Sequence, residues 1–159
     1  MTTSYIFTDR SALDTAVEAW ITDEAAAIET YGDINTWDVS GITDFSWLFR
    51  LTSFNSDISE WDVSNGTNFS AMFNYNGAFN QDISGWDVSN VQYMYQMFNG
   101  ASAFNQNIRQ WNISDSADLT NMLVSSGLSD APATPTIGDG NYFDLDGTND
   151  YIPVSYTHL

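Results

Sequence analysis

The sequence predicts an α/β solenoid built from about four repeats of 24–25 residues. Trp37, Trp61, Trp86 and Trp111 recur at intervals of 24, 25 and 25 residues. Each tryptophan lies in a motif of the form Ile-x-x-Trp-x-Val or Ile-x-x-Trp-x-Ile, and a serine follows each motif directly. A fixed period in this range is typical of a solenoid, in which each repeat buries its apolar face only against its neighbours.

Within each repeat, the pattern predicts a turn, a short strand and a short helix. Apolar residues at i, i+3 and i+5 match the L-x-x-L-x-L core of a leucine-rich repeat, in which the second and third residues point inward from a strand. A second apolar set follows with spacings of three and four, as in Phe45, Leu48 and Phe49. Such spacings are typical of one helix face. Serines precede these segments as expected N-caps: Ser40, Ser64, Ser89 and Ser114.

The two ends of the chain read differently from the repeats. Near the N-terminus, Leu13, Val17, Trp20 and Ile21 share one face of an expected helix that Thr8 or Asp9 can cap. Near the C-terminus, alternating apolar residues flank an Asp-Gly pair, which predicts a hairpin. The expected units are a helical cap (1–30), a leucine-rich-repeat solenoid (31–125), a linker (126–140), the truncated start of a β-sandwich module (141–153) and a non-native tail (154–159).

The composition narrows the classes of partner. The chain has 21 acidic residues, three arginines and no lysine, with a formal net charge of −18. Such a charge repels phosphate backbones, so nucleic acid and anionic membrane surfaces are poor candidates as partners. We expect no nucleic-acid partner and no membrane insertion, because no stretch approaches the length of an apolar membrane span. The absence of cysteine excludes disulfides and thiolate chemistry. The N-terminus lacks the features of a signal peptide, and we expect a monomeric fragment.

The candidate ligand-binding residues lie on the expected concave face of the solenoid. They flank the inward strand positions and comprise Asp38, Ser40, Glu60, Asp62, Ser64, Asp87, Ser89 and Asn112. Aspartates stacked about 4.8 Å apart repel one another unless something offsets their charge. Asp38, Asp62 and Asp87 could bind calcium, could present acceptors to a ligand, or could accept hydrogen bonds from nearby hydroxyl and backbone groups. No other cofactor is expected.

The aromatic columns are expected to form the structural core. Trp37, Trp61, Trp86 and Trp111 would bury large areas, as would Phe54, Phe79 and Phe104 at the closing turn of each unit. The asparagines that follow these phenylalanines (Asn55, Asn80 and Asn105) are expected to satisfy backbone groups at the turns. Because the prominent aspartates all belong to the repeat, they are expected to be structural, and no catalytic residues are predicted.

Three stretches carry resemblances to known sequences. The run from Phe79 to Val91, followed by Met94, Met97 and Phe98, resembles the BspA-type leucine-rich repeat of bacterial and marine microbial surface proteins. This resemblance covers roughly residues 31 to 124 and implies a role in adhesion or surface recognition. Residues 143–152 resemble the first strands of a concanavalin-like or laminin-G-like sandwich. Residues 154–159 resemble one reading frame of a sequencing-library adapter, so the natural chain is expected to continue past Pro153.

Together these features predict a non-enzymatic module for adhesion or recognition. It would bind a host-surface protein or a glycan through the concave strand face, outside the cell, at the cell surface or on a virion. The alternative is a passive structural spacer of a larger secreted or virion protein, whose binding or enzymatic activity lies downstream.

Overall fold

Two α-helices form the N-terminal end of the molecule. The computed structural model describes residues 4–128 and the backbone of three short strands beyond them. Helix α1 (Arg10–Thr22) begins where the Asp9 side chain accepts a hydrogen bond from the backbone N–H of Ala12 at 2.9 Å. The predicted helix and its Asp9 cap are thus confirmed. Leu13, Val17 and Trp20 are buried as expected, but Ile21 is 44% exposed.

Helix α2 (Glu24–Tyr31) follows directly, because Asp23 both ends α1 and caps α2 through the N–H of Ala26. A single 3₁₀ turn, η1 (Ile34–Thr36), then leads into the first repeat. The Trp20 ring of α1 meets the Trp37 ring edge-on, with 5.8 Å between the ring centroids. The helices are therefore joined to the repeats through aromatic packing.

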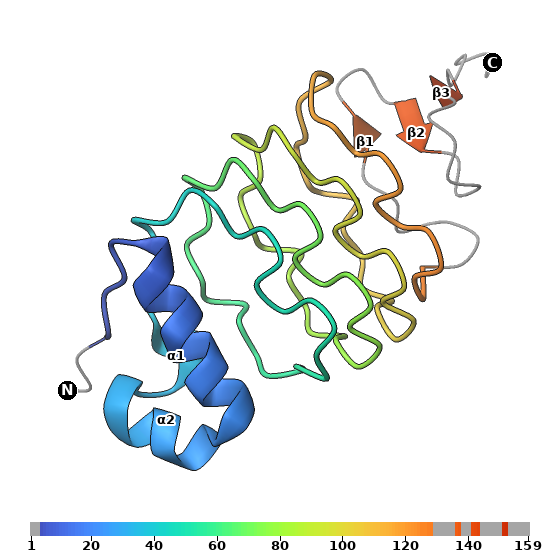
Figure 1. Ribbon diagram of the computed structural model, residues 1–159. Helices are drawn as coiled ribbons and strands as arrows, with labels where there is room; N and C mark the ends of the chain where they lie inside the picture. Colours follow the sequence, from blue (N-terminus) through green and yellow to red (C-terminus); the bar gives the residue numbers. More distant parts are fainter. Residues whose placement is uncertain (1–3, 129–135, 138–140, 144–150, 153–159) are drawn as a thin grey trace.

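After α2 the chain runs as successive coils stacked against one another, with the helices at one end (Figure 1). Each coil contains one stretch that aligns with its neighbours. We call these four stretches (44–51, 68–75, 93–100 and 118–125) the ladder segments. Single-residue parallel bridges align their first residues, Asp44 with Asn68, Asn68 with Tyr93, and Tyr93 with Asp118.

The predicted strand of each repeat is absent, since residues 4–128 contain no strand. In the motif around Trp61, the Trp61 N–H bonds the Ile58 carbonyl at 3.2 Å, and the Gly66 N–H bonds the Val63 carbonyl at 2.8 Å. Both bonds close tight turns. The i, i+3, i+5 pattern therefore arises from consecutive turns, which also bring the tryptophan and valine inward.

The predicted helix of each repeat is absent as well, because left-handed residues interrupt it. Every ladder segment has a positive φ at its fourth and eighth positions, as at Trp47 (66°) and Leu51 (58°). An α-helix requires negative φ throughout. The spacing of three and four still buries Phe45, Leu48 and Phe49, but from a chain of turns. The α/β leucine-rich-repeat solenoid is therefore wrong: the described repeats are built from turns around a large aromatic cluster.

The ladder segments are joined by backbone hydrogen bonds that nearly all point one way. Phe45, Trp47, Phe49 and Leu51 donate their N–H groups to carbonyls of the second ladder segment at 2.8–3.0 Å. The same four positions repeat this at each of the two later junctions, at 2.7–2.9 Å. Left-handed non-glycine residues cost roughly 1–2 kcal/mol each. The added hydrogen bonds and the burial of the intervening side chains offset that cost.

The core is a stack of aromatic rings that runs through all the coils. Phe49, Phe73 and Phe98 stack at 5.4 and 5.5 Å between ring centroids. Each also lies 3.9–4.0 Å from the phenylalanine that closes its own coil, namely Phe54, Phe79 or Phe104. All six rings are buried. Neighbouring coils thus share one continuous aromatic core.

Three very short strands lie beyond the coils. Strands β1 (Thr136–Ile137), β2 (Asn141–Phe143) and β3 (Tyr151–Ile152) form an antiparallel sheet in the order β1-β2-β3. Phe143 pairs with Tyr151, and Tyr142 with Ile152. The expected linker lies largely outside the described residues, as does the expected Asp-Gly turn. The tail at 154–159 lies outside them entirely.

Candidate recognition surface

The aspartates predicted as ligands accept hydrogen bonds from their own turns. Ser40 donates to Asp38 Oδ1 through its backbone N–H at 3.0 Å and its hydroxyl at 2.6 Å. Ser64 does the same to Asp62 at 3.1 and 2.6 Å. In these Asx turns the carboxylate finds its hydrogen-bond donors two residues further along the chain. The serines therefore act as donors to the preceding aspartate, and not as helix N-caps.

The same turns shift the carboxyl groups towards their ionised form. Hydrogen bonds from the Ser40 hydroxyl and N–H lower the pKa of Asp38 from its ordinary value of 3.8. Hydrogen bonds from Ser89 lower the pKa of Asp87, and those from Ser84 lower the pKa of Asp82. A hydrogen bond to the charged form favours ionisation, so the Asp-x-Ser motifs that begin at Asp38, Asp82 and Asp87 each hold a stable anionic turn.

The other predicted surface residues do not combine with these aspartates into a metal centre. Glu60 is exposed, and its backbone N–H donates to Asn35 Oδ1 at 2.9 Å. Asn112 is exposed on the fourth coil. Within the described residues, no group of three or more His, Cys, Asp or Glu side chains is placed to hold a metal ion. The concave strand face is also missing as a surface, because these residues lie in turns.

The tryptophan column is buried and links each coil to the one before it. Indole Nε1 of Trp61 donates to the Ile34 carbonyl at 2.7 Å, and that of Trp86 to the Ile58 carbonyl at 3.2 Å. Trp111 repeats the bond to Ile83 at 3.1 Å. These rings are 1–4% exposed, so they hold the stack together and are not available to a ligand.

Asparagines make a second set of links between coils. The Asn55 side-chain oxygen accepts from the Asn80 N–H at 2.8 Å, and that of Asn80 accepts from the Asn105 N–H at 2.9 Å. Gln81 Nε2 also donates to the Asn55 carbonyl at 2.8 Å. Within the described residues, no buried side-chain nitrogen or oxygen lacks a hydrogen-bond partner. The polar columns are thus occupied by structural bonds.

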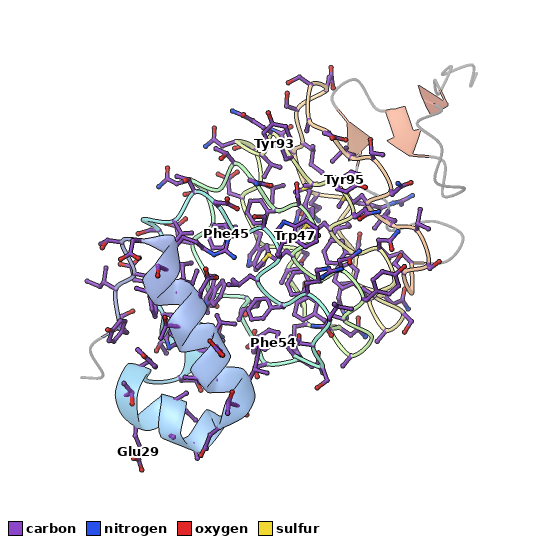
Figure 2. All side chains as sticks on the ribbon, viewed as in Figure 1. Glu29, Phe45, Trp47, Phe54, Tyr93 and Tyr95 are labelled. Carbon is purple, nitrogen blue, oxygen red and sulfur yellow. The ribbon has the colours of Figure 1, made fainter. Side chains whose placement is uncertain are left out.

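Large exposed rings gather on the ladder segments, a surface that the sequence analysis missed. We call the outward side chains of these segments the ladder face. Its large exposed members are Trp47, Leu51, Tyr75, Tyr93 and Tyr95, of which Trp47 is 50% exposed, Tyr75 60% and Tyr93 51%. Figure 2 labels three of these rings over the coils, with Glu29 of α2 at the other end of the molecule. Their signal in the sequence is a large aromatic residue at positions where the other repeats mostly have small or polar residues (Ala, Gly, Ser, Thr, Asn, Asp or Gln).

The ladder face carries carboxylates only in its first row, although the protein is acidic. Past their first residues, Asp44, Asn68, Tyr93 and Asp118, the ladder segments contain no Asp or Glu. Their one charged residue is Arg50, whose guanidinium carbon lies 5.0 Å from the centre of the Trp47 ring. The 21 acidic side chains lie elsewhere in the chain or at the ends of this face. The face is therefore the neutral, aromatic side of a strongly anionic molecule.

A smaller recess lies between α1 and the first coil. This open groove of about 300 Å³ is lined by Trp20, Ile21, Glu24, Phe54 and Asn55, among others. Trp20 Nε1 donates to Ser56 Oγ at 3.0 Å across its floor. Because its two large rings are nearly fully buried in the core, the groove offers less aromatic area than the ladder face.

These features define a domain of hydrogen-bonded turns stacked around an aromatic core, with one exposed aromatic face. The chain belongs to the family described as Mycoplasma protein of unknown function, DUF285, whose model matches residues 4–131. This match corrects the expected assignment to BspA-type leucine-rich repeats. No curated protein and no solved structure matches the chain. No helix in the described residues is long and apolar enough to cross a membrane.

Proposed function

We propose that the protein is a non-enzymatic recognition module that binds a protein or a glycan at a cell or virion surface. The exposed aromatic cluster on the ladder face is the observation that carries this proposal. Tyrosine and tryptophan are the residues that most often anchor binding surfaces. Five large hydrophobic side chains gathered on one face exceed the scattered exposure of an ordinary soluble surface.

The rigidity of the scaffold supports the same proposal. Backbone bonds of 2.7–3.0 Å fix the ladder segments to one another, and each segment has buried apolar residues beneath it. Exposed rings on such a support lose little conformational entropy when they bind a partner. The acidic turns around Asp38, Asp62 and Asp87 already accept local hydrogen bonds, so they are better suited to structure and solubility than to binding.

Adhesion of protein-coated beads to cells tests this function. Fluorescent beads carrying the wild-type protein are incubated with a panel of bacterial and animal cells and counted by flow cytometry. A ladder-face variant, Trp47→Asn with Tyr75→Asn, is compared with a control, Ile21→Ser with Ile28→Ser, which removes exposed apolar side chains from α1 and α2. We expect the ladder-face variant to lose most adhesion and the control to retain it.

Asparagine is chosen at both ladder positions for a structural reason. Trp47 and Tyr75 have φ values of 66° and 54°, and asparagine adopts this left-handed region more readily than other residues with a side chain. The rings are thus removed without straining the coil. If wild-type beads adhere to no cell, or adhere as well as those carrying the ladder-face variant, the recognition function is wrong and the spacer reading takes its place.

A further inference from the structure

We propose that the ladder face binds an uncharged glycan chain that crosses three successive coils and stacks its sugars on Trp47, Tyr75 and Tyr95. This inference rests on the proposed function and names the chemistry of its ligand. It follows from the support of the rings, their arrangement over the coils, the polar groups of the ladder segments and the charge of the molecule.

Two of the rings are held as platforms. A methyl group added at Gly100 would lie 2.6 Å from Cδ1 of Tyr75, so the Tyr75 ring rests directly on the backbone of the next coil while remaining 60% exposed. Trp47 is held by Arg50, whose Nε donates to Asn74 Oδ1 at 3.2 Å. A flat ring supported on one side and open on the other suits the apolar C–H face of a pyranose.

The rings also come from three successive coils. Trp47 comes from the first ladder segment, Tyr75 from the second, and Tyr93 and Tyr95 from the third. The buried phenylalanines beneath these segments repeat every 5.0–5.5 Å, which gives the spacing of the coils. Trp47, Tyr75 and Tyr95 take the fourth, eighth and third positions of their segments, so they stand in different columns of the face. A polymer bound across this face has a ring available on each of three successive coils, and these weak contacts add together.

The ladder segments also carry polar groups that can bond the hydroxyl groups of a sugar. The hydroxyls of Tyr93 and Tyr95 both donate and accept, and the Asn121 amide at the fourth coil offers one acceptor and two donors. Sugar hydroxyls are themselves donors and acceptors, so this mixture complements them. A face meant only for apolar packing would carry aliphatic side chains at such positions.

The charge decides between glycan classes and between a glycan and a basic protein. A net charge of −18 repels polyuronates and sulfated chains. A basic protein would be drawn to carboxylates, yet the ladder face lacks them past Asp44 and Asp118 and carries Arg50. A neutral polysaccharide is not repelled by the net negative charge of the protein, and it needs no carboxylates on the ladder face to bind.

Affinity electrophoresis provides the test. The protein is run in native gels containing soluble neutral polysaccharides (mixed-linkage β-glucan, xylan, galactomannan or α-mannan), with alginate and heparin as anionic comparators. We expect at least one neutral polysaccharide to retard the wild-type protein, and the anionic ones not to do so. Trp47→Asn and Tyr75→Asn should each weaken that binding about tenfold, as loss of a central aromatic contact does.

Gln96→Asn serves as the matched control. Gln96 occupies the same left-handed ladder position as Trp47 in another coil, with φ of 55°, and its replacement removes no ring. Thermal midpoints within a few degrees of wild type establish that the variants are folded. The control should bind within twofold of wild type. Equal retardation of the ring variants and the wild-type protein would overturn the proposal, as would loss of binding by the control.

The bead assay separates failure of this inference from failure of the function. If no neutral polysaccharide retards the protein but beads still adhere through the ladder face, the glycan is wrong and recognition stands. Protease treatment of the cells should then abolish adhesion, which identifies a protein partner. If adhesion is independent of the ladder face as well, both proposals fall.

Discussion

Arg10 donates from Nη2 to the backbone carbonyl of Ser46 across 2.7 Å. Its Nη1 donates to the Asp44 carbonyl at 3.0 Å, and its Nε bonds Asp14 at 2.7 Å. Both carbonyls belong to the first ladder segment, at the end towards which the ladder carbonyls point. Aligned peptide dipoles leave partial negative charge at such an end, as they do at a helix C-terminus. One of the three arginines thus covers the edge of the ladder beside α1.

Replacing this arginine should weaken the whole domain. Arg10→Met keeps the apolar stem but leaves the Asp44 and Ser46 carbonyls without their donor, which we expect to lower the free energy of unfolding by about 1–3 kcal/mol. Urea denaturation followed by tryptophan fluorescence measures the change. The control, Asp14→Asn, removes only an exposed ion pair and should cost no more than about 0.5 kcal/mol. Equal losses would show that the carbonyl contacts contribute nothing.

Removal of one indole N–H should loosen the contact between two coils. Trp86→Phe keeps most of the buried ring but leaves the Ile58 carbonyl without the donor at 3.2 Å. We expect a loss of about 1–3 kcal/mol in calorimetry. The same exchange at the half-exposed Trp47 should cost well under that amount. The role of the indole N–H would be refuted if both variants melted together with the wild-type protein.

Gly100→Ala should destabilise the protein through Tyr75. Gly100 has a φ of 74°, a backbone conformation that residues with a side chain rarely adopt. The Cβ of alanine would also lie 2.6 Å from Cδ1 of the Tyr75 ring. We expect a loss of about 1–3 kcal/mol. In the Tyr75→Asn background only the backbone strain remains, so the cost should fall clearly. A double-mutant cycle without coupling would mean that the ring does not rest on the glycine.

The turn at Asp38 should contribute to the loss of folding stability at low pH. Its pKa is lowered in the folded protein, so its stabilisation is fully present above the ordinary value of 3.8 and is lost as pH falls through the lower folded value. Ser40→Ala removes the hydroxyl donor at 2.6 Å and should return the pKa towards 3.8. An NMR titration of the Asp38 carboxyl in both proteins checks this; identical curves would exclude the hydroxyl as the cause.

The sequence contained enough information to place α1 and its cap. A helix with Leu13, Val17 and Trp20 on one face is decided locally, by a capping aspartate and a period of about 3.6 residues. The spacing of apolar residues also told which side chains point inward within each repeat. The spacing of apolar residues indicates which side chains point into the core. It does so whether the backbone between them forms a helix or a series of turns.

The backbone of the repeats could not be obtained in this way. Spacings of three and four suit a helix face, but they also suit a chain of turns with left-handed residues at Trp47 and Leu51. Neither residue favours that conformation on its own, and it becomes stable only when the N–H groups between them bond the next coil. That is a non-local effect. For the same reason the exposed rings of Tyr75 and Tyr93 could not be assigned to one face beforehand.

The one-way hydrogen bonding of the ladder restricts the symmetry with which such molecules can associate. A two-fold axis would place donor edge against donor edge, or acceptor edge against acceptor edge, so no isologous dimer can form through the ladder edges. Only head-to-tail joining matches donors to acceptors, and repetition of that contact gives an open fibre. Arg10 occupies the Asp44 and Ser46 carbonyls at the acceptor edge, so the helical end of the molecule keeps these two acceptors from such a head-to-tail contact.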